Sequence, residues 1–186
     1  MKRACSLALV LLTAACAQRT SEPSPIVKEN ELTANLLMNA FETGDVSQLG
    51  SLFFPSAYYD DYSSARQYRG LEEISGYVRS LQDWANSIIM SVDKVHAWEG
   101  GAVVEWTLSA VQDKPIPGRV TEATGHEIVV NGVTILEISN HRITRAADYM
   151  DNLNMMLQLG GELHMPGGLV IKNDVPSLPD TAGVGG

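Results

Sequence analysis

The sequence predicts an α+β fold in which two helices precede an antiparallel sheet. Apolar residues recur at the 3.6-residue spacing of a helix up to about residue 85, and from there to about residue 150 they alternate with polar residues. Helical segments followed by a run of strands are typical of folds that carry the helices on one face of the sheet. With 186 residues, of which 45% are hydrophobic, the chain has room for one domain with a single core.

The first helix is predicted to end at Gly44, because glycine commonly terminates a helix. Its apolar stripe consists of Leu32, Leu36, Leu37, Ala40 and Phe41. The segment DVSQLGSLFFP continues as a short helical turn that ends before Pro55. The residues that follow, 56–70, are aromatic and polar without a clear period, and we interpret them as irregular.

The second helix, which follows Gly70, has the clearest pattern in the chain. One stripe contains Leu71, Ile74, Tyr77, Val78, Leu81, Trp84 and Ala85. After it the period changes from 3.6 to 2, and the segments SIIMSVDKVHAW and AVVEWTLSA flank a tight hairpin turn at Glu99-Gly100-Gly101. In the second segment the apolar residues share one face and the polar residues the other, so we expect one covered and one solvated face.

Three more segments complete the predicted sheet: TGHEIVV, GVTILEI and RITRAADYM, with the turn SNH between the last two. The dipeptide Asn131-Gly132 is either a hairpin turn or a bulge within one long strand. The segment DKPIPGR is predicted to be a loop. The segment NLNMMLQLGG is predicted to be a short helix or turn that ends at Gly160.

The N-terminal residues 1–16 are not part of the predicted domain, which covers residues 29–160. MKRACSLALVLLTAAC has a basic start, a short apolar core and small residues before Cys16, as secretory signals do. The ending LTAAC resembles a bacterial lipoprotein signal, although Thr13 stands where that class favours Leu. The resemblance implies that residues 1–15 are removed and that Cys16 carries a lipid, which would hold the protein at a membrane of the cell envelope. The alternative is a simple secretory signal cut near Ala15, with Cys16 an unmodified thiol.

Two segments are predicted to lack stable structure. Residues 16–28 are polar with two prolines, and we interpret them as a flexible tether. Residues 161–186 are rich in proline and glycine, and we expect a disordered tail with one short apolar patch at 169–171.

The charge and the motif content exclude several classes of function. A net charge of −9 without a basic stripe argues against a nucleic-acid partner, because phosphate backbones bind Lys and Arg. The four histidines, at positions 96, 126, 141 and 164, lack the spacing of metal ligands. The sequence has no nucleophile elbow, no glycine-rich phosphate loop and no CxxC pair, so we expect neither a metal nor a cofactor.

Several segments, in their order along the chain, resemble the SnoaL-like branch of the nuclear-transport-factor-2-like (NTF2-like) superfamily. They are TGD after the first helix, FFPSAYYDD followed by RG, VVEWTLS, TGHEIVVNGVTILEISNHRI and DYMDNLNMMLQLGG. The resemblance spans nearly the whole predicted domain. It implies a cone in which a strongly curved antiparallel sheet wraps the N-terminal helices and leaves a pocket open at one end. The superfamily contains polyketide cyclases, ketosteroid isomerases and proteins that only bind ligands, so the fold does not decide the function.

Two acids near the end of the predicted sheet have different expected roles. The resemblance places Asp148 where catalytic members carry an acid that projects into the pocket, and strand alternation puts it on one face with Met150. Burial there would raise the pKa of Asp148 and suit it to proton transfer. The alternative is an exposed acid, or one that is hydrogen-bonded to a tyrosine. Asp151 lies where the last strand meets the final helix and is predicted to cap that helix.

Four further residues are candidates for the ligand pocket: Tyr59, Asp61, Trp106 and Met150. Tyr59 and Asp61 resemble positions at which limonene epoxide hydrolases hold a water, and their alternative is a surface loop. Trp106 lies on the apolar face of its strand, and its alternative is a core tryptophan. The epoxide hydrolases also place Arg and Asp two residues apart on this strand. Because Trp106 and Leu108 stand there instead, we do not expect epoxide hydrolysis.

Three functions are compatible with these features. We favour a lipid-anchored protein that binds a small hydrophobic ligand in the cone. The second function is an acid/base enzyme of the isomerase or cyclase type that uses Asp148. The third is an interaction protein whose sheet face pairs with another subunit. The resemblance also implies a homodimer through the outer face of the sheet.

Overall fold

The computed structural model describes residues 22–173 and has a six-stranded sheet as its main element. The strand order is β2-β1-β6-β5-β4-β3. The strands are β1 (Phe53–Asp61), β2 (Arg66–Arg69), β3 (Ile88–Trp98), β4 (Gly101–Val111), β5 (Glu127–Ser139) and β6 (Arg142–Met150). Neighbours are antiparallel except β1 and β6, which pair in parallel and are separated in the chain by helix α3 and the four strands β2–β5. The predicted α+β class is confirmed, with this parallel pair as an addition.

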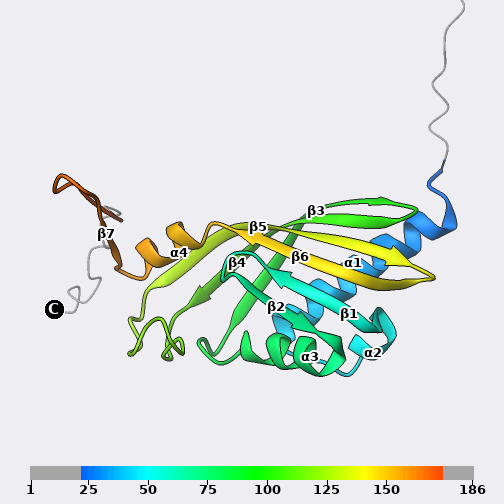
Figure 1. The fold of residues 1–186 in the computed structure, drawn as a ribbon, viewed down its shortest axis with the longest axis horizontal. Coiled ribbons are helices and arrows are strands. Elements are labelled where there is room, and N and C mark those ends of the chain that lie inside the picture. Colours follow the sequence, from blue (N-terminus) through cyan, green and yellow to red (C-terminus); the bar gives the residue numbers. More distant parts are fainter. Residues whose placement is uncertain (1–21, 174–186) are drawn as a thin grey trace, which may run out of the picture.

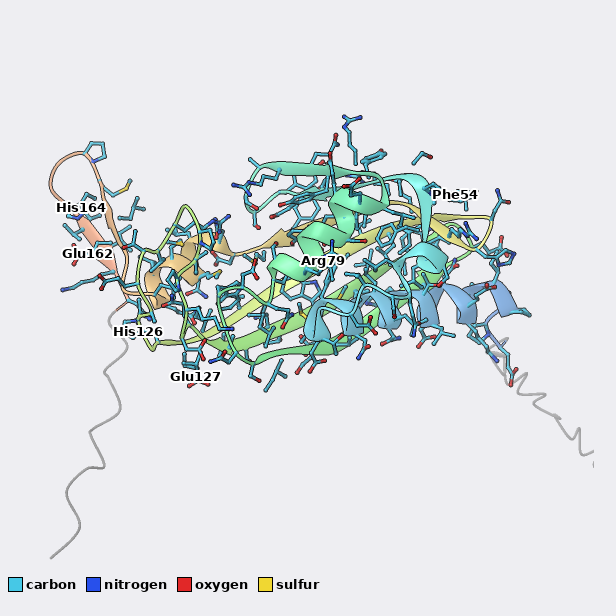
Figure 2. All side chains as sticks on the ribbon, turned by 90° about the horizontal axis from the view of Figure 1, so that it is seen from below. Phe54, Arg79, His126, Glu127, Glu162 and His164 are labelled. Atoms are coloured by element: carbon cyan, nitrogen blue, oxygen red, sulfur yellow. The ribbon has the colours of Figure 1, made fainter. Side chains whose placement is uncertain are left out.

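The helices cover one face of the sheet. The long helix α1 (Pro25–Thr43) packs against β3 and β4, and α3 (Gly70–Ser80) packs against β1 and β2 (Figures 1 and 2). A single turn, α2 (Leu49–Leu52), leads into β1, and α4 (Asn152–Gln158) follows β6. The buried sides of α1 and α3 and the inner face of the sheet form one continuous core, which positions the side chains described below.

Helix α1 begins inside the segment predicted to be a flexible tether. Its first residue is Pro25, which fits the first turn because a helix needs no N–H bond there. Gly44, at φ 69°, ends the helix as predicted. Leu32 was expected in the apolar stripe but is 58% exposed, because the buried face is centred on Leu37 and Phe41. The predicted signal and the lipidation residue Cys16 lie outside the described residues.

The segment 56–70 is not irregular, contrary to the prediction. Most of it forms the hairpin of β1 and β2, with Tyr59 opposite Tyr68 and Asp61 opposite Arg66. Tyr59, Asp60 and Asp61 are all buried in succession, so the polar and apolar residues of β1 do not alternate. This explains why the period-2 signal was missing, since both faces of β1 are covered at that point.

Residues 127–139 form one long strand, which settles the alternatives for Asn131-Gly132. Gly132 pairs with Trp106 of β4, and a Cβ atom on Gly132 would lie 2.3 Å from the indole ring. The glycine therefore serves neither a turn nor a bulge. It makes room for the indole of Trp106 to cross β5.

The first part of the predicted disordered tail is also structured. Strands β7 (Glu162–His164) and β8 (Val170–Lys172) form a two-stranded hairpin that projects beyond the end of the main sheet, where Figure 2 labels Glu162 and His164 near His126. The rest of the tail, from residue 174, lies outside the described residues. Within residues 22–173, no helix combines the length and the apolar character that a membrane crossing requires.

Candidate functional site

A cavity of about 370 Å³ lies between the inner face of the sheet and the helices. Its walls are mainly apolar and aromatic, and they include Phe41, Tyr77, Trp84, Met90, Trp106, Leu108, Val130 and Met155. Polar groups line the rest, among them Asp61, Ser63, Arg66, Asp83, Arg119 and Asp148. A largely apolar cavity with a few polar groups is the usual form of a small-molecule site.

Asp148 is the buried acid of this cavity. It lies on β6 and pairs with Asp61 of β1 across the parallel register, and only 7% of its surface is exposed. Burial raises the pKa of Asp148 to about 7, because the ionised form loses its hydration. The hydrogen bond from Thr134 and the nearby hydroxyl of Tyr59 lower this pKa in part, and the charge of Asp61 raises it. Near neutral pH the carboxyl group can therefore exist in both its protonated and its ionised form.

Two side chains from neighbouring strands form a hydrogen-bonded chain that ends on Asp148. The hydroxyl of Thr134 on β5 donates to Oδ1 of Asp148 at 2.5 Å, and the indole Nε1 of Trp106 on β4 donates to the Thr134 oxygen at 2.8 Å. All three residues are buried. The register brings them together, since Thr134 pairs with Asp148 and Trp106 lies two residues from Val104, the partner of Thr134.

Tyr59 lies behind the cavity rather than in its wall. The side chain is fully buried and packs edge-on against Phe41, with its ring centroid 5.0 Å from that of Tyr77. The hydroxyl of Tyr59 has no partner with hydrogen-bond geometry in the described chain, although it is close enough to Asp148 for each to shift the pKa of the other. Burial raises the pKa of Tyr59 well above its usual value, so the phenol stays neutral and acts as a hydrogen-bond donor or acceptor.

Asp61 lines the cavity, but its carboxylate is already engaged. It accepts hydrogen bonds from the hydroxyls of Ser63 and Ser64 and from the backbone N–H of Ser64 at 3.1 Å. These bonds close the turn between β1 and β2, so part of the role of Asp61 is local. Asp151 accepts from the N–H of Asn154 at 2.9 Å and caps α4, as predicted for this acid.

Trp106 and Met150, both expected at the pocket, line the cavity, whereas Tyr59 does not. Four residues of the site were not predicted as such: Thr134, Tyr77 and the two arginines Arg66 and Arg119. Thr134 carries a usable signal, because it is a polar residue on the inward side of an otherwise apolar strand, GVTILEI. Arg119 lies in the long loop between β4 and β5, and the fold of this loop brings it to the cavity. Its guanidinium donates to Asn152 at 3.0 Å.

This arrangement has the chemistry of proton exchange next to an apolar molecule. A carboxyl group with a pKa near 7 can give or take a proton at neutral pH. In the part of the chain that the structure describes, no three His, Cys, Asp or Glu side chains gather closely enough to hold a metal ion.

Comparisons with known proteins support the SnoaL-like fold that the sequence predicts. The profile of the SnoaL-like domain family matches residues 34–146. No curated protein matches the chain. Among solved structures, a proposed SnoaL-like polyketide cyclase from Jannaschia sp. CCS1 is similar at a TM-score of 0.68 and 19% identity, over 76% of this chain and 98% of that one.

Two other structures show that the same fold occurs in proteins of different description. IdmH, a proposed polyketide cyclase from Streptomyces antibioticus, aligns at a TM-score of 0.62 and 18% identity, over 71% of this chain and 99% of that one. An epoxide hydrolase from M. tuberculosis aligns at 0.54 and 20% identity, over 73% of this chain and 92% of that one. At these identities the likeness concerns the fold.

Proposed function

The chain belongs to the SnoaL-like domain family, and from this premise we propose that it binds a small, largely apolar molecule in the cavity beside Asp148. The observation that carries the proposal is the cavity of about 370 Å³, whose walls are mainly aromatic and aliphatic and which is lined by the buried acid Asp148. Burial of apolar ligand surface would supply the affinity, and the polar groups would orient the ligand.

A pair of adjacent residues on β5 offers a matched test of binding. Val130 lines the cavity and is buried, whereas Val129 lies on the opposite face and is 45% exposed. We expect Val130→Phe to weaken the binding of an apolar fluorescent probe at least tenfold by filling the cavity, and Val129→Phe to leave binding unchanged. Thermal unfolding of both variants checks that each is folded. Equal binding by both variants would contradict the proposal.

Proton transfer by Asp148 is the alternative function. Two observations favour it: the raised pKa of Asp148 and the unpartnered hydroxyl of Tyr59 nearby. An isomerase or cyclase that relies on Asp148 should lose on the order of 10²–10⁴ in rate in the Asp148→Asn variant and still bind its ligand. A protein that only binds should show a changed affinity at most.

We also propose attachment to a membrane of the cell envelope through a lipid on Cys16. The support is the sequence LTAAC at residues 12–16. The several acyl chains of a bacterial lipoprotein would hold the protein firmly, whereas one chain holds weakly. The Cys16→Ser protein should leave the membrane fraction, and an unchanged distribution would contradict this proposal.

A homodimer through the outer face of the sheet is a further proposal. Ile89, Val111 and Val129 are about half exposed there, and the strand register brings Ile89 and Val129 to the two sides of Ser109. A second copy would cover these apolar side chains. Analytical ultracentrifugation of the chain without residues 1–16 tests this, and a monomer at tens of micromolar (roughly the range of a working homodimer) would contradict it.

A further inference from the structure

A chain of three buried side chains ends on Asp148. Trp106 of β4 donates from Nε1 to the Thr134 oxygen at 2.8 Å, and Thr134 of β5 bonds to Oδ1 of Asp148 at 2.5 Å. The indole is held from the other side by Gly132, whose missing side chain leaves the space that the ring fills. The three groups therefore have little freedom to change partners.

The direction of the hydrogen bonds in this chain follows from the donors available. An indole N–H can only donate, so the Thr134 oxygen must accept from Trp106. The hydroxyl proton of Thr134 is then directed at Asp148, its other hydrogen-bond partner among the described residues. The distance of 2.5 Å between the Thr134 hydroxyl and Oδ1 is short, as is typical of a hydroxyl that donates to a carboxylate in a charge-assisted bond.

We infer that Thr134, fixed by Trp106, is a positioning residue that occupies Oδ1 of Asp148 and leaves Oδ2 as the atom that gains and loses the proton. The assignment holds in both states of the acid. In the ionised state Oδ1 accepts from Thr134, and in the neutral state Oδ1 remains the accepting oxygen while the added proton resides on Oδ2. No hydrogen bond joins Oδ2 to the chain over residues 22–173, although the hydroxyl of Tyr59 lies near the carboxyl group. Because Asp148 lines the cavity, Oδ2 is the oxygen left for a ligand there.

Other titratable groups also face Asp148, and their effects must be separated from that of Thr134. Tyr59 and Asp61 approach it from β1, and Tyr77 approaches it from α3. Tyr59 lowers the pKa of Asp148 through its hydroxyl, and Asp61 raises it through its charge. Since none of these residues changes in a Thr134 variant, a shift seen there belongs to the Thr134 hydroxyl.

Two substitutions at one position test the inference. Thr134→Val keeps the branched shape and removes the hydroxyl, so the ionised form of Asp148 loses a donor while its burial remains. We expect its proton affinity to rise about tenfold, as seen in the pH titration of the Asp148 carboxyl carbon by NMR. Thr134→Ser restores the hydroxyl and should return the titration to that of the unmodified protein.

The outcomes distinguish positioning from packing. A Thr134→Val protein that is folded by its NMR spectrum and titrates as the unmodified protein does would overturn the inference, as would a Thr134→Ser protein that titrates like the Val variant. If Thr134→Val does not fold, Trp106→Phe provides the second test, because it frees the Thr134 hydroxyl to turn away and should raise the same titration midpoint. The inference rests on the proposed binding role of the cavity, but its test needs no ligand. Failure of the Val130→Phe experiment would therefore refute binding without affecting this result.

Discussion

The two faces of the β1–β6 strand pair both carry buried acids, and they satisfy those acids in opposite ways. On the outer face, Asp60 accepts from Arg145 at 3.0 Å and from Gln67 at 2.7 Å, and the same guanidinium reaches Glu137 and Tyr62. On the inner face, Asp148 has one neutral donor, Thr134, and lies next to a second acid, Asp61. Only two residues lie between Arg145 and Asp148 along β6.

The difference shows which acid is available for chemistry. Hydrogen bonds to Asp60, Glu137 and Tyr62 outweigh the effect of burial and raise the pKa of Arg145, so the outer cluster stays charged and closed on itself. The inner acid has no cation to neutralise it, and burial raises its pKa to about 7. The outer cluster stabilises the sheet, whereas the inner acid costs stability and retains a free oxygen.

Removing the cation of the outer cluster should have the largest effect on stability. Arg145→Met leaves Asp60 nearly buried without its charged partner, and we expect a loss of about 2 to 4 kcal/mol in the free energy of unfolding. Urea denaturation measures it. Arg142→Met on the same strand is the control, because Arg142 is exposed and forms no ion pair in the described chain, and it should change stability by less than ~0.5 kcal/mol. An equal loss of stability in the two variants would show that Arg145 contributes no more to the fold than an exposed arginine does.

Filling the space beneath Trp106 should disturb the inner face. Gly132→Ala places a Cβ atom about 2.3 Å from the indole, so the ring must move and its bond to Thr134 is strained. We expect a loss of about 1 to 3 kcal/mol by urea denaturation, as for other overpacked cores. Gly76→Ala is the control, since a Cβ atom on Gly76 would meet no atom of another part of the chain within 4 Å. Alanine favours the helix at this exposed position, so the free energy of unfolding should rise by about 0.5 to 1 kcal/mol. A neutral Gly132→Ala would show that the indole is not held there.

Removing the charge of Asp148 should increase stability in a pH-dependent way. The folded pKa of about 7 lies above the ~3.9 of an unfolded chain, so the folded state binds more protons between these values and its stability falls as pH rises from 4 to 7. At pH 8, Asp148→Asn should be more stable than the unmodified protein by about 1 to 2 kcal/mol, and near pH 4 the two should be alike. Thermal unfolding at both pH values checks this, and a difference independent of pH would contradict it.

The smallest effect is expected at Asp151, the acid that caps α4. Asn also accepts from a free helix N–H, so Asp151→Asn should change stability by less than ~0.5 kcal/mol, whereas Asp151→Ala should cost about 1 kcal/mol. Chemical denaturation of both variants tests the cap. A large loss in Asp151→Asn would give this carboxylate a role beyond capping.

The sequence was sufficient where one physical signal dominates. The period of α3, the alternation of β4 and the glycine that ends α1 all predicted the observed elements. The hairpin of β1 and β2 was missed because both faces of β1 are covered, so its buried acids looked like a loop. The parallel pairing of β1 and β6 is a contact between residues far apart in sequence, which local periodicity does not report.

In the candidate site, too, some residues could be predicted from the sequence and others could not. Alternation placed Asp148 and Met150 on the inner face, but the exact phase of β6 depends on an irregularity near Thr144, which lets Ile143 and Ala146 both face inward. Tyr59 was expected in the pocket wall, and the helix α3 covers it with Tyr77 instead. Thr134 stands out in the sequence as a polar residue on an apolar strand face, but its hydrogen-bond partner Asp148 lies 14 residues away and follows only from the register of β5 against β6.

The most direct test of the account is the pH titration of the Asp148 carboxyl carbon by NMR in the unmodified protein, with Asp148→Asn to assign the signal. The account predicts a midpoint near 7 in the free protein and a changed midpoint when an apolar probe fills the cavity, because the ligand alters the surroundings of Oδ2. A midpoint near the ~3.9 of an ordinary aspartate, unmoved by the probe, would place this side chain in solvent and contradict the central claim.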